Sequence, residues 1–333
     1  MKPHSESSAP ELSVIIPMYN AGKSFEAFMA SLLAQTLPSI EIIIVNDGST
    51  DESAGMAHHY AAQYAHVQVI DQQNGGVSRA RNAGMAMAKG QYVTFPDADD
   101  KLAPEMYSRL MAMAKADDLD IAQCNAERVF WGGDKAKPLI PTDRLRSTSV
   151  LSGAEWLSKA LATNRYLHVV WLGIYRRSLI NDLNLQFEPG LHHQDIPWTT
   201  ELMLNARRVR YSEEVMYRYY VHDLSISNQK RTGARNVEYQ RHYLKIARML
   251  DEINQRYKSK VRISAPLYRQ VTKEALTVCH SIRREPDAEA RQMMIAYLIA
   301  SKTPGRMLRN ARGLRQWYQL LLWLSRIYRW RKA

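Results

Sequence analysis

The sequence predicts an α/β fold, with a mostly parallel sheet covered by helices on both faces and a helical C-terminal region after it. Residues 12–18 and 40–46 are apolar runs solid enough to be buried strands. Between them, residues 24–33 carry apolar side chains at helical spacing. Such alternation of strand and helix is typical of a parallel sheet with right-handed crossovers.

The same alternation continues through the first hundred residues. Further strands are expected at 67–71 and 92–95, and further helices at 52–65 and 77–89. The run Asn74-Gly75-Gly76 breaks the chain before the second of these helices.

After residue 100 the pattern loosens. Helices are expected at 106–116, 154–162, 179–183 and 196–206, and strands at 121–130, 168–175 and 209–222. Loops are expected at 131–141 and 190–195, and residues from 236 onward are helical in pattern. We therefore expect a disordered N-terminus (1–11), an α/β domain (12–228, with halves 12–120 and 121–228) and a helical region (229–333).

Charge is unevenly distributed along the 333 residues. Residues 1–150 carry 13 Lys and Arg against 18 Asp and Glu, or −5, and residues 151–333 carry 32 against 15, or +17, which sum to the net charge of +12. An acidic first half does not favour a nucleic-acid-binding protein, whereas a basic second half suits an anionic acceptor or membrane. Cys124 and Cys279 are in no metal spacing, which favours free thiols in a reducing compartment. We expect no secretion signal and no membrane span.

A pair of carboxylates follows the strand expected at 92–95. Asp97 and Asp99 emerge at its carboxyl end, where ligands bind in open α/β sheets, and their spacing makes them point the same way. Close like charges tolerate each other best beside a divalent cation, which predicts Mg²⁺ or Mn²⁺ completed by substrate phosphates. The alternative is an acidic turn that caps the next helix, with Asp100 as N-cap and Pro104 in the first turn.

Other strand ends also offer groups suited to a nucleotide. Tyr19 and Asn20 follow the first strand, and Asp47 follows the second. Gly75-Gly76 lets backbone approach a ligand and opens a helix N-terminus, which favours anions. Arg79 and Arg81 lie in that helix's first turns, where a solvated face is the alternative explanation.

Four motifs in this order and spacing carry a family resemblance: ELSVIIPMYNAG, EIIIVNDGSTDES, NGGVSRARNAG and YVTFPDADD. Together they resemble family-two glycosyltransferases of the glycosyltransferase-A fold, which invert the anomeric centre. The resemblance implies that Asp97 and Asp99 bind a divalent metal on the donor diphosphate. It also implies that Pro17, Tyr19, Asp47 and Arg79 hold the nucleotide. Together with the groups at the strand ends, the expected donor site comprises Pro17, Tyr19, Asn20, Asp47, Gly76, Arg79, Asp97 and Ala98.

An inverting transfer needs a base that takes the proton of the acceptor hydroxyl. The family's base is an Asp at a helix start after the first domain, and His193-Gln194-Asp195 matches that position, with Gln194 in place of the usual Glu. Asp195 is therefore the expected base, with a helix N-cap as the alternative. His222 and Ser225 resemble the family's His-x-x-Ser segment, so His222 is a further candidate metal ligand or a surface histidine.

The second half resembles the enterobacterial lipopolysaccharide-core glycosyltransferases that add glucuronic acid from its UDP donor to a heptose. HVVWLGIYRR, GLHHQDIPWTTELMLNARRVRY and YQRHYLKIARML carry that likeness. It implies a UDP-sugar donor, a lipopolysaccharide-core acceptor and transfer of one residue. Galacturonic acid and glucose stay open as the sugar. Arg176, Arg177, His192 and His193 are candidates for binding a uronic acid.

Two rival functions stay open. A sugar-phosphate nucleotidyltransferase would need a Gly-rich phosphate loop directly after the first strand, and residues 17–20 are not one. A basic membrane- or nucleic-acid-binding protein is the non-enzymatic alternative.

The C-terminal segment predicts attachment to a membrane surface. Residues 301–333 contain nine Lys and Arg and no acid. Their apolar residues recur at helical spacing: Trp317, Leu320, Leu321, Leu324, Ile327 and Tyr328. Basic residues opposite such a face are typical of an interfacial helix, so we expect a peripheral protein at the cytoplasmic, anionic face of the inner membrane. The alternative is that this face packs on the protein's own core.

Overall fold

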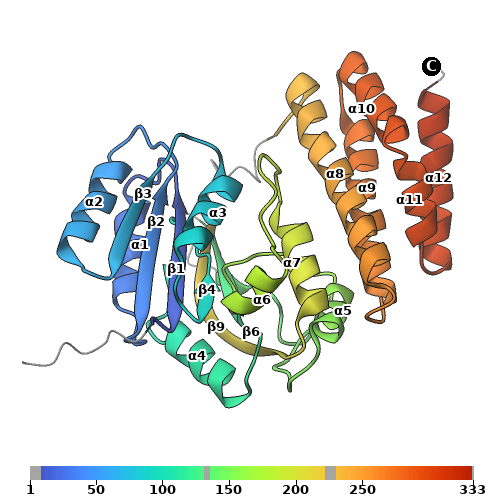
Figure 1. Cartoon of the computed structure of the whole chain (residues 1–333). Helices are drawn as coiled ribbons and strands as arrows, with labels where there is room; N and C mark the ends of the chain where they lie inside the picture. The colour runs from blue at the N-terminus through green and yellow to red at the C-terminus, as the bar shows by residue number, and fades with distance from the viewer. Residues whose placement is uncertain (1–8, 131–135, 222–229, 332–333) are drawn as a thin grey trace, which may run out of the picture. The chain divides into compact units, whose positions relative to one another are not determined.

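The computed structural model describes residues 9–130, 136–221 and 230–331. The chain forms two compact units (Figure 1). The first comprises Met1–Gly153, Leu167–Gly190 and Asn205–Val221, and the second comprises Ala154–Tyr166, Leu191–Leu204 and His222–Ala333. The boundaries expected from the sequence, at 12, 120 and 228, stay a prediction, and most of the N-terminal tail lies outside the described residues.

The first unit is built on one mixed sheet. Its described strands are β1 (Leu12–Met18), β2 (Ile40–Asn46), β3 (Val67–Asp71), β4 (Tyr92–Thr94), β5 (Lys101–Leu102), β6 (Ile121–Phe130), β7 (Ala136–Pro138), β8 (Gly173–Arg176) and β9 (Val209–Val221). They lie in the order β3-β2-β1-β4-β8-β6-β9-β5, and β7 pairs with β6. The first four strands are parallel to one another, as expected for apolar strands joined by helices.

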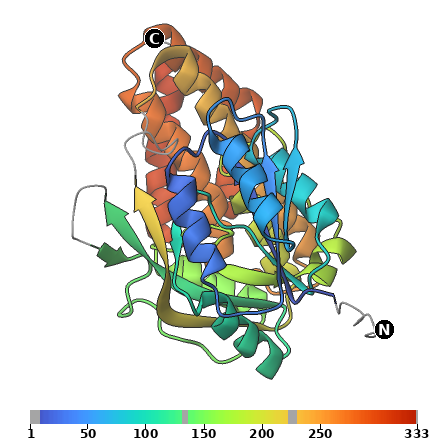
Figure 2. The ribbon, with the colours of Figure 1, turned by 90° about the vertical axis from the view of Figure 1, so that its left-hand side faces the viewer.

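The remaining strands extend the sheet by mixed pairing. β8 is antiparallel to both β4 and β6, whereas β6 and β9 are parallel. The β6–β9 register shifts on either side of Asn125, and β9 is strongly curved (Figure 2). Irregularities of this kind bend a strand and increase its local twist.

Helices cover both faces of this sheet. α1 (Ser24–Leu33), α2 (Ser53–Gln63) and α4 (Met106–Ala116) share one apolar cluster with alternate residues of β1, including Leu12, Val14 and Ile16. α3 (Val77–Met87) packs against β1 and β2 on the other face, where Gly84 lies directly against Ile15. The predicted α/β fold class, with a mostly parallel sheet and a helical C-terminal region, is confirmed.

Some local predictions were wrong. The strand expected at 168–175 begins only at Gly173, and the loop expected at 131–141 contains the short strand β7. β5, two residues long, was not predicted. α6 (Arg177–Asp182) begins two residues before the helix expected at 179–183. The short strands β5, β7 and β8 depend on pairing with distant strands, and elements this short leave little periodicity in the sequence.

The second unit is helical. Its described residues include α5 (Gly153–Ala162), α7 (Asp195–Asn205) and a group of further helices that stand side by side in Figure 1. These are α8 (Gly233–Tyr257), α9 (Ala265–Arg284), α10 (Ala288–Ala300), α11 (Thr303–Asn310) and α12 (Leu314–Trp330). A single apolar cluster joins them, from Val237 in α8 to Ile327 in α12.

The apolar residues of α12 divide between two faces. Leu320, Leu324 and Ile327 are buried, so this part of the predicted membrane-facing stripe instead packs on the protein's own core. Trp317 and Leu321 are 40% and 58% exposed and lie on a second apolar face, beside the buried one. Among the described residues, no helix is long and apolar enough to cross a bilayer.

Gly84 is expected to set the distance between α3 and the sheet. A Cβ atom at Gly84 would lie 2.3 Å from Ile15 Cγ2, far inside van der Waals contact. Gly84→Ala should therefore lower the free energy of unfolding by roughly 1–3 kcal/mol, the usual cost of overpacking. Urea unfolding followed by circular dichroism would measure it.

Gly55 provides the matched control, because it is also helical and a Cβ there would meet nothing within 4 Å. Gly55→Ala should stabilise the protein slightly, by about 0.5–1 kcal/mol. Equal stability of Gly84→Ala and wild type would contradict this account of helix–sheet packing.

Candidate functional site

The carboxyl ends of the parallel strands lie at one edge of the sheet. Met18 pairs with Asn46, and Asn46 pairs with Asp71, so β1, β2 and β3 end level with one another. β4 runs parallel to β1 and ends at Thr94, and the acidic run begins three residues later at Asp97. The loops that follow these strands therefore emerge on the same side, as the sequence predicted.

Three carboxylates follow β4, each in a different environment. Asp97 is 35% exposed at its side chain and accepts a hydrogen bond from Arg81 Nη2 at 3.0 Å. Asp99 is exposed, and Asp100 is only 1% exposed. Asp100 accepts bonds from the Tyr217 hydroxyl at 2.7 Å and from the Tyr220 N–H at 2.9 Å. Asp100 therefore stabilises the turn by binding β9, whereas the side chains of Asp97 and Asp99 are more accessible to solvent.

The pKa shifts show that the unit's own groups stabilise these charges poorly. Burial raises the pKa of Asp100 well above its ordinary value, and the charges of Asp97 and Asp99 raise it further. Burial also raises the pKa of Asp97, even though the Arg81 guanidinium acts in the opposite direction. A cation beside Asp97 and Asp99 would favour the ionised form of all three carboxylates.

The donor set of Asp97 and Asp99 fits a hard divalent cation. Arg81 donates a hydrogen bond to Oδ1 of Asp97. Asp97 and Asp99 both supply carboxylate oxygens, the ligands that Mg²⁺ and Mn²⁺ prefer. No group of three His, Cys, Asp or Glu suited to a metal occurs within the described ranges. Two carboxylates would thus need waters or phosphates to complete the shell. His222, the other candidate ligand, lies outside those ranges.

Asp47 organises the loop before α3. Its Oδ1 accepts hydrogen bonds from Gln72 Nε2 at 2.6 Å and from the Gly75 N–H at 2.8 Å, and its Oδ2 accepts from the Gly76 N–H at 2.7 Å. Asp47 is 3% exposed, so its buried carboxylate stabilises the loop from its protein-facing side. Gly76 has φ +85° as the N-cap of α3, a backbone conformation that glycine adopts at little cost.

The loop after β1 is tied to the loop after β2. Asn20 has φ +48°, its Oδ1 accepts from the Thr50 N–H at 2.8 Å, and its N–H donates to Ser49 Oγ at 3.1 Å. Tyr19 beside it is 53% exposed. An exposed ring on a fixed loop can stack on a planar base, as expected for a nucleotide site. Pro17 is half-buried and Ala98 is buried in the same region of the unit, and Arg79 is exposed on α3.

The expected base belongs to the second unit. Asp195 is half-buried in the first turn of α7, and its carbonyl accepts a bond from Thr199 Oγ1 at 2.7 Å. His193 before it has φ +57°, and its Nε2 lies 2.7 Å from the Tyr239 hydroxyl and 3.0 Å from that of Tyr243. Burial, His192 and other nearby cations lower the pKa of His193 to about 4, so its ring is neutral at pH 7.

Arg176 and Arg177 do not belong to the carboxyl edge of the sheet. Arg176 pairs with Tyr92 at the start of β4, and its Nη2 donates to Asp118 Oδ1 at 2.7 Å. Arg177 Nε donates to the Gly90 carbonyl at 2.6 Å. Both arginines contact the amino end of β4, away from the carboxyl edge, and a role for them in binding a uronic acid stays a prediction.

The supporting roles of several residues were not predicted from the sequence. Arg81 is 4% exposed and pairs with Asp97, although a solvated face had been its alternative explanation. Tyr217 reaches the acidic turn from β9, about 120 positions away, and Gln72 supports Asp47. Of these roles, only that of Arg81 left a signal in the sequence. Arg81 lies two positions from the expected donor-site residue Arg79, so the two arginines point to different faces of the helix and cannot both be on its solvated face.

The comparisons with known proteins agree on the family. Residues 13–179 match the model of glycosyl transferase family 2, and residues 232–333 match that of the YibD glycosyltransferase C-terminal domain. An uncharacterized glycosyltransferase, YibD of Escherichia coli K12, is 51% identical over 324 residues, 97% of this chain and 94% of its own length. The uncharacterized glycosyltransferase EpsJ of Bacillus subtilis is 37% identical over 63% of this chain and 61% of its own.

Solved structures share the fold at low identity. TarS residues 1–349 of S. aureus, in complex with UDP-GlcNAc, aligns with a TM-score of 0.60 at 20% identity, covering 90% of this chain and 89% of that one. The mannosyltransferase PcManGT of Pyrobaculum calidifontis, in complex with GDP-Man and Mn²⁺, aligns with a TM-score of 0.51 at 15% identity, covering 99% and 87%.

Proposed function

This chain belongs to glycosyl transferase family 2 and is a nucleotide-sugar-dependent, inverting glycosyltransferase, and we propose that it transfers a single glucuronic acid from UDP-glucuronate to a heptose of the lipopolysaccharide core. The observation that supports a donor site in the first unit is the acidic pair Asp97 and Asp99 at the same sheet edge as the Asp47-supported glycine loop. Transfer of galacturonic acid or glucose to the same kind of acceptor is the alternative.

The first unit is proposed to bind the donor. Tyr19 stacks on the base, the N–H groups at the start of α3 and the exposed Arg79 approach the diphosphate, and Asp47 keeps that loop in place. Asp97 and Asp99 would hold Mg²⁺ or Mn²⁺, and such an ion would supply positive charge to the leaving diphosphate. The neighbours in complex with UDP-GlcNAc and with GDP-Man and Mn²⁺ have the same fold, which is consistent with this assignment.

Asp195 is proposed to act as the base. Its carboxylate takes the proton of the acceptor hydroxyl while that oxygen attacks the anomeric carbon and the nucleotide leaves. One such displacement inverts the anomeric centre without a covalent enzyme intermediate. The half-buried position of Asp195 at the start of α7 suits a carboxylate that must reach a substrate.

The second unit is proposed to attach the enzyme to the anionic inner face of the bacterial inner membrane through α12. Trp317, Tyr318 and Leu321 are exposed on this helix, which also carries the exposed cations Arg326 and Arg329. Aromatic and aliphatic groups beside arginines are typical of interfacial helices, and each cation near an anionic leaflet contributes about 1 kcal/mol. A lipid-linked acceptor would make such attachment useful.

Asp99→Ala is expected to abolish transfer and metal-dependent UDP binding while leaving the protein folded, because Asp99 is exposed. Isothermal titration of UDP in the presence and absence of Mn²⁺ measures the binding, and thermal unfolding checks the fold. Asp143→Ala, at a side chain that is 76% exposed in the same unit, is the matched control and should behave as wild type. Wild-type turnover of Asp99→Ala in excess Mn²⁺ would exclude this metal site.

Asp195→Asn is expected to reduce transfer by about 10²–10⁴-fold, the usual contribution of a positioned base, with UDP-sugar affinity nearly unchanged. Asparagine keeps the size and most hydrogen bonds of aspartate, so the change tests the charge rather than packing. Asp287→Asn at the N-cap of α10 is the control for a helix-start aspartate and should keep full activity. A loss of less than tenfold at every pH would assign the base to another group.

Trp317→Ser/Leu321→Ser is expected to weaken sedimentation with phosphatidylglycerol vesicles at low salt, because both side chains are exposed and outside the core. Tyr297→Ser, 40% exposed on α10, is the control. Salt should weaken binding of the wild type, and neutral vesicles should not bind it. If the double variant pellets as well as wild type, α12 is not the membrane-binding surface.

A further inference from the structure

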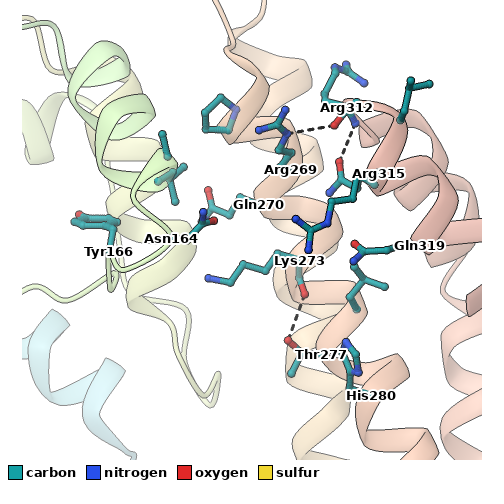
Figure 3. A pocket seen from close by; sticks show the side chains of 17 residues that line it. Asn164, Tyr166, Arg269, Gln270, Lys273, Thr277, His280, Arg312, Arg315 and Gln319 are labelled. Carbon is teal, nitrogen blue, oxygen red and sulfur yellow. Dashed lines mark hydrogen bonds between the residues drawn. The ribbon is translucent and has the colours of Figure 1, made fainter. Parts of the chain in front are cut away.

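The second unit contains a pocket of about 630 Å³ that none of the roles above uses. It is bounded by α9, by the start of α12 and by the segment after α5, all parts of the same unit (Figure 3). A volume of this size suits a ligand as large as a mono- or disaccharide.

The walls of this pocket are strongly cationic. Arg269, Lys273, Arg312 and Arg315 line it, and the lining contains no Asp or Glu. Figure 3 shows Lys273 and Arg315 around the same space. His280 also contributes to the wall, but burial and the charges of nearby arginines lower its pKa, so the ring is neutral at pH 7. The pocket thus carries four positive charges.

Two of these cations, Arg269 and Arg312, are held by neutral groups. Arg269 Nε donates to the Arg312 carbonyl at 3.2 Å, and Arg312 Nη1 donates to the carbonyls of Ala311 and Arg309 at 2.8 and 2.9 Å. The Arg312 guanidinium also lies 3.8 Å from the centre of the Tyr268 ring. Carbonyls and rings hold a guanidinium in position without neutralising it, so the charge stays available to a ligand.

Some other arginines of the same unit are paired with acids. Arg256 pairs with Glu201 at 2.5 Å, Arg241 with Glu238 at 3.0 Å, and Arg309 with Asp251. Within the described ranges, none of the four pocket cations forms an ion pair with a carboxylate. Because gathered like charges repel one another, a pocket of this kind is stabilised when an anion enters it.

The remaining polar groups suit hydroxyls. Asn164 and Gln319 line the pocket with amides, which can both donate to and accept from a sugar hydroxyl. The first turn of α12, from Gly313, also borders the pocket, and the N-terminal end of a helix favours negative charge. Cations for a phosphate therefore lie beside neutral hydrogen-bonding groups for the sugar that carries it.

We propose that this pocket is a second binding site, specific for a phosphorylated saccharide, and that it holds a phosphate-bearing sugar of the acceptor. The identification of that saccharide as part of the acceptor rests on the proposed function, whereas the binding of a sugar phosphate does not. The site would select acceptors by their phosphorylation and would leave the transfer step itself unchanged.

The first experiment measures binding alone. Glucose 6-phosphate, inorganic phosphate and glucose are titrated into the full-length protein by calorimetry, with Lys273→Gln/Arg315→Gln as the test variant. Both changed side chains are exposed, so the variant should fold. Arg235→Gln/Arg262→Gln removes the same charge from exposed positions of the same unit outside the pocket and is the control.

Glucose 6-phosphate should bind the wild type and the control with the same dissociation constant. Its dissociation constant for the test variant should be higher by about tenfold or more, as expected when charged hydrogen bonds are lost. Glucose should not bind, and UDP affinity with Mn²⁺ should be the same in all three proteins. The proposal is overturned if the test variant binds glucose 6-phosphate as wild type does, if the control loses as much, or if inorganic phosphate binds as tightly as the sugar phosphate.

The second experiment tests the acceptor. With a phosphorylated core oligosaccharide, the test variant should show a KM raised about tenfold or more and an unchanged kcat, and phosphatase treatment of the acceptor should remove the difference from wild type. An equal KM for both proteins would exclude a role in acceptor binding. Absence of any transfer by the wild type would contradict the proposed function while the calorimetric result still decides the binding site.

Discussion

The arrangement of the first unit depends on three carboxylates in the four-residue run Asp97–Asp100 after β4. Such charges repel one another, and the fold holds them by separate means. Asp100 is fixed by Tyr217 and the backbone of β9, and Asp97 is held by Arg81 from α3. The turn can therefore form only when β4, α3 and β9 are all assembled around it. Asp99 stays exposed, and the acidic pair is oriented before any ligand arrives.

The two units use opposite electrostatics for related purposes. The first gathers acids at a sheet edge, where a cation and a diphosphate would complete their partners, and the second gathers cations in a pocket without acids. At the sheet edge, burial raises the pKa values of Asp97 and Asp100. In the pocket, none of the four cations forms an ion pair with a carboxylate within the described ranges. A bound ion of opposite charge would therefore stabilise either site.

The sequence predicted the first strands well because each is a solid apolar run between polar residues. The boundaries of β1, β2 and β3 agree to the residue, and the expected strand-end groups do lie along one edge. The pairings of β8, β6 and β9 could not be predicted, since antiparallel and parallel neighbours are chosen by contacts far apart in the chain. The partners of Asp47 and Asp97 were hidden for the same reason. Charge runs and apolar spacing in α12 predicted an amphipathic helix but could not separate its buried face from its exposed one.

The strand order has a consequence for how the chain folds during synthesis. β4 lies next to β1 on one side and next to β8 on the other, and β8 is made about eighty residues later. While the ribosome is still adding those residues, the edge of β4 presents unpaired N–H and C=O groups and an apolar surface. Such an edge can pair with another chain, so the nascent protein passes through an aggregation-prone stage that ends only when β8, and then β9, are added to the sheet.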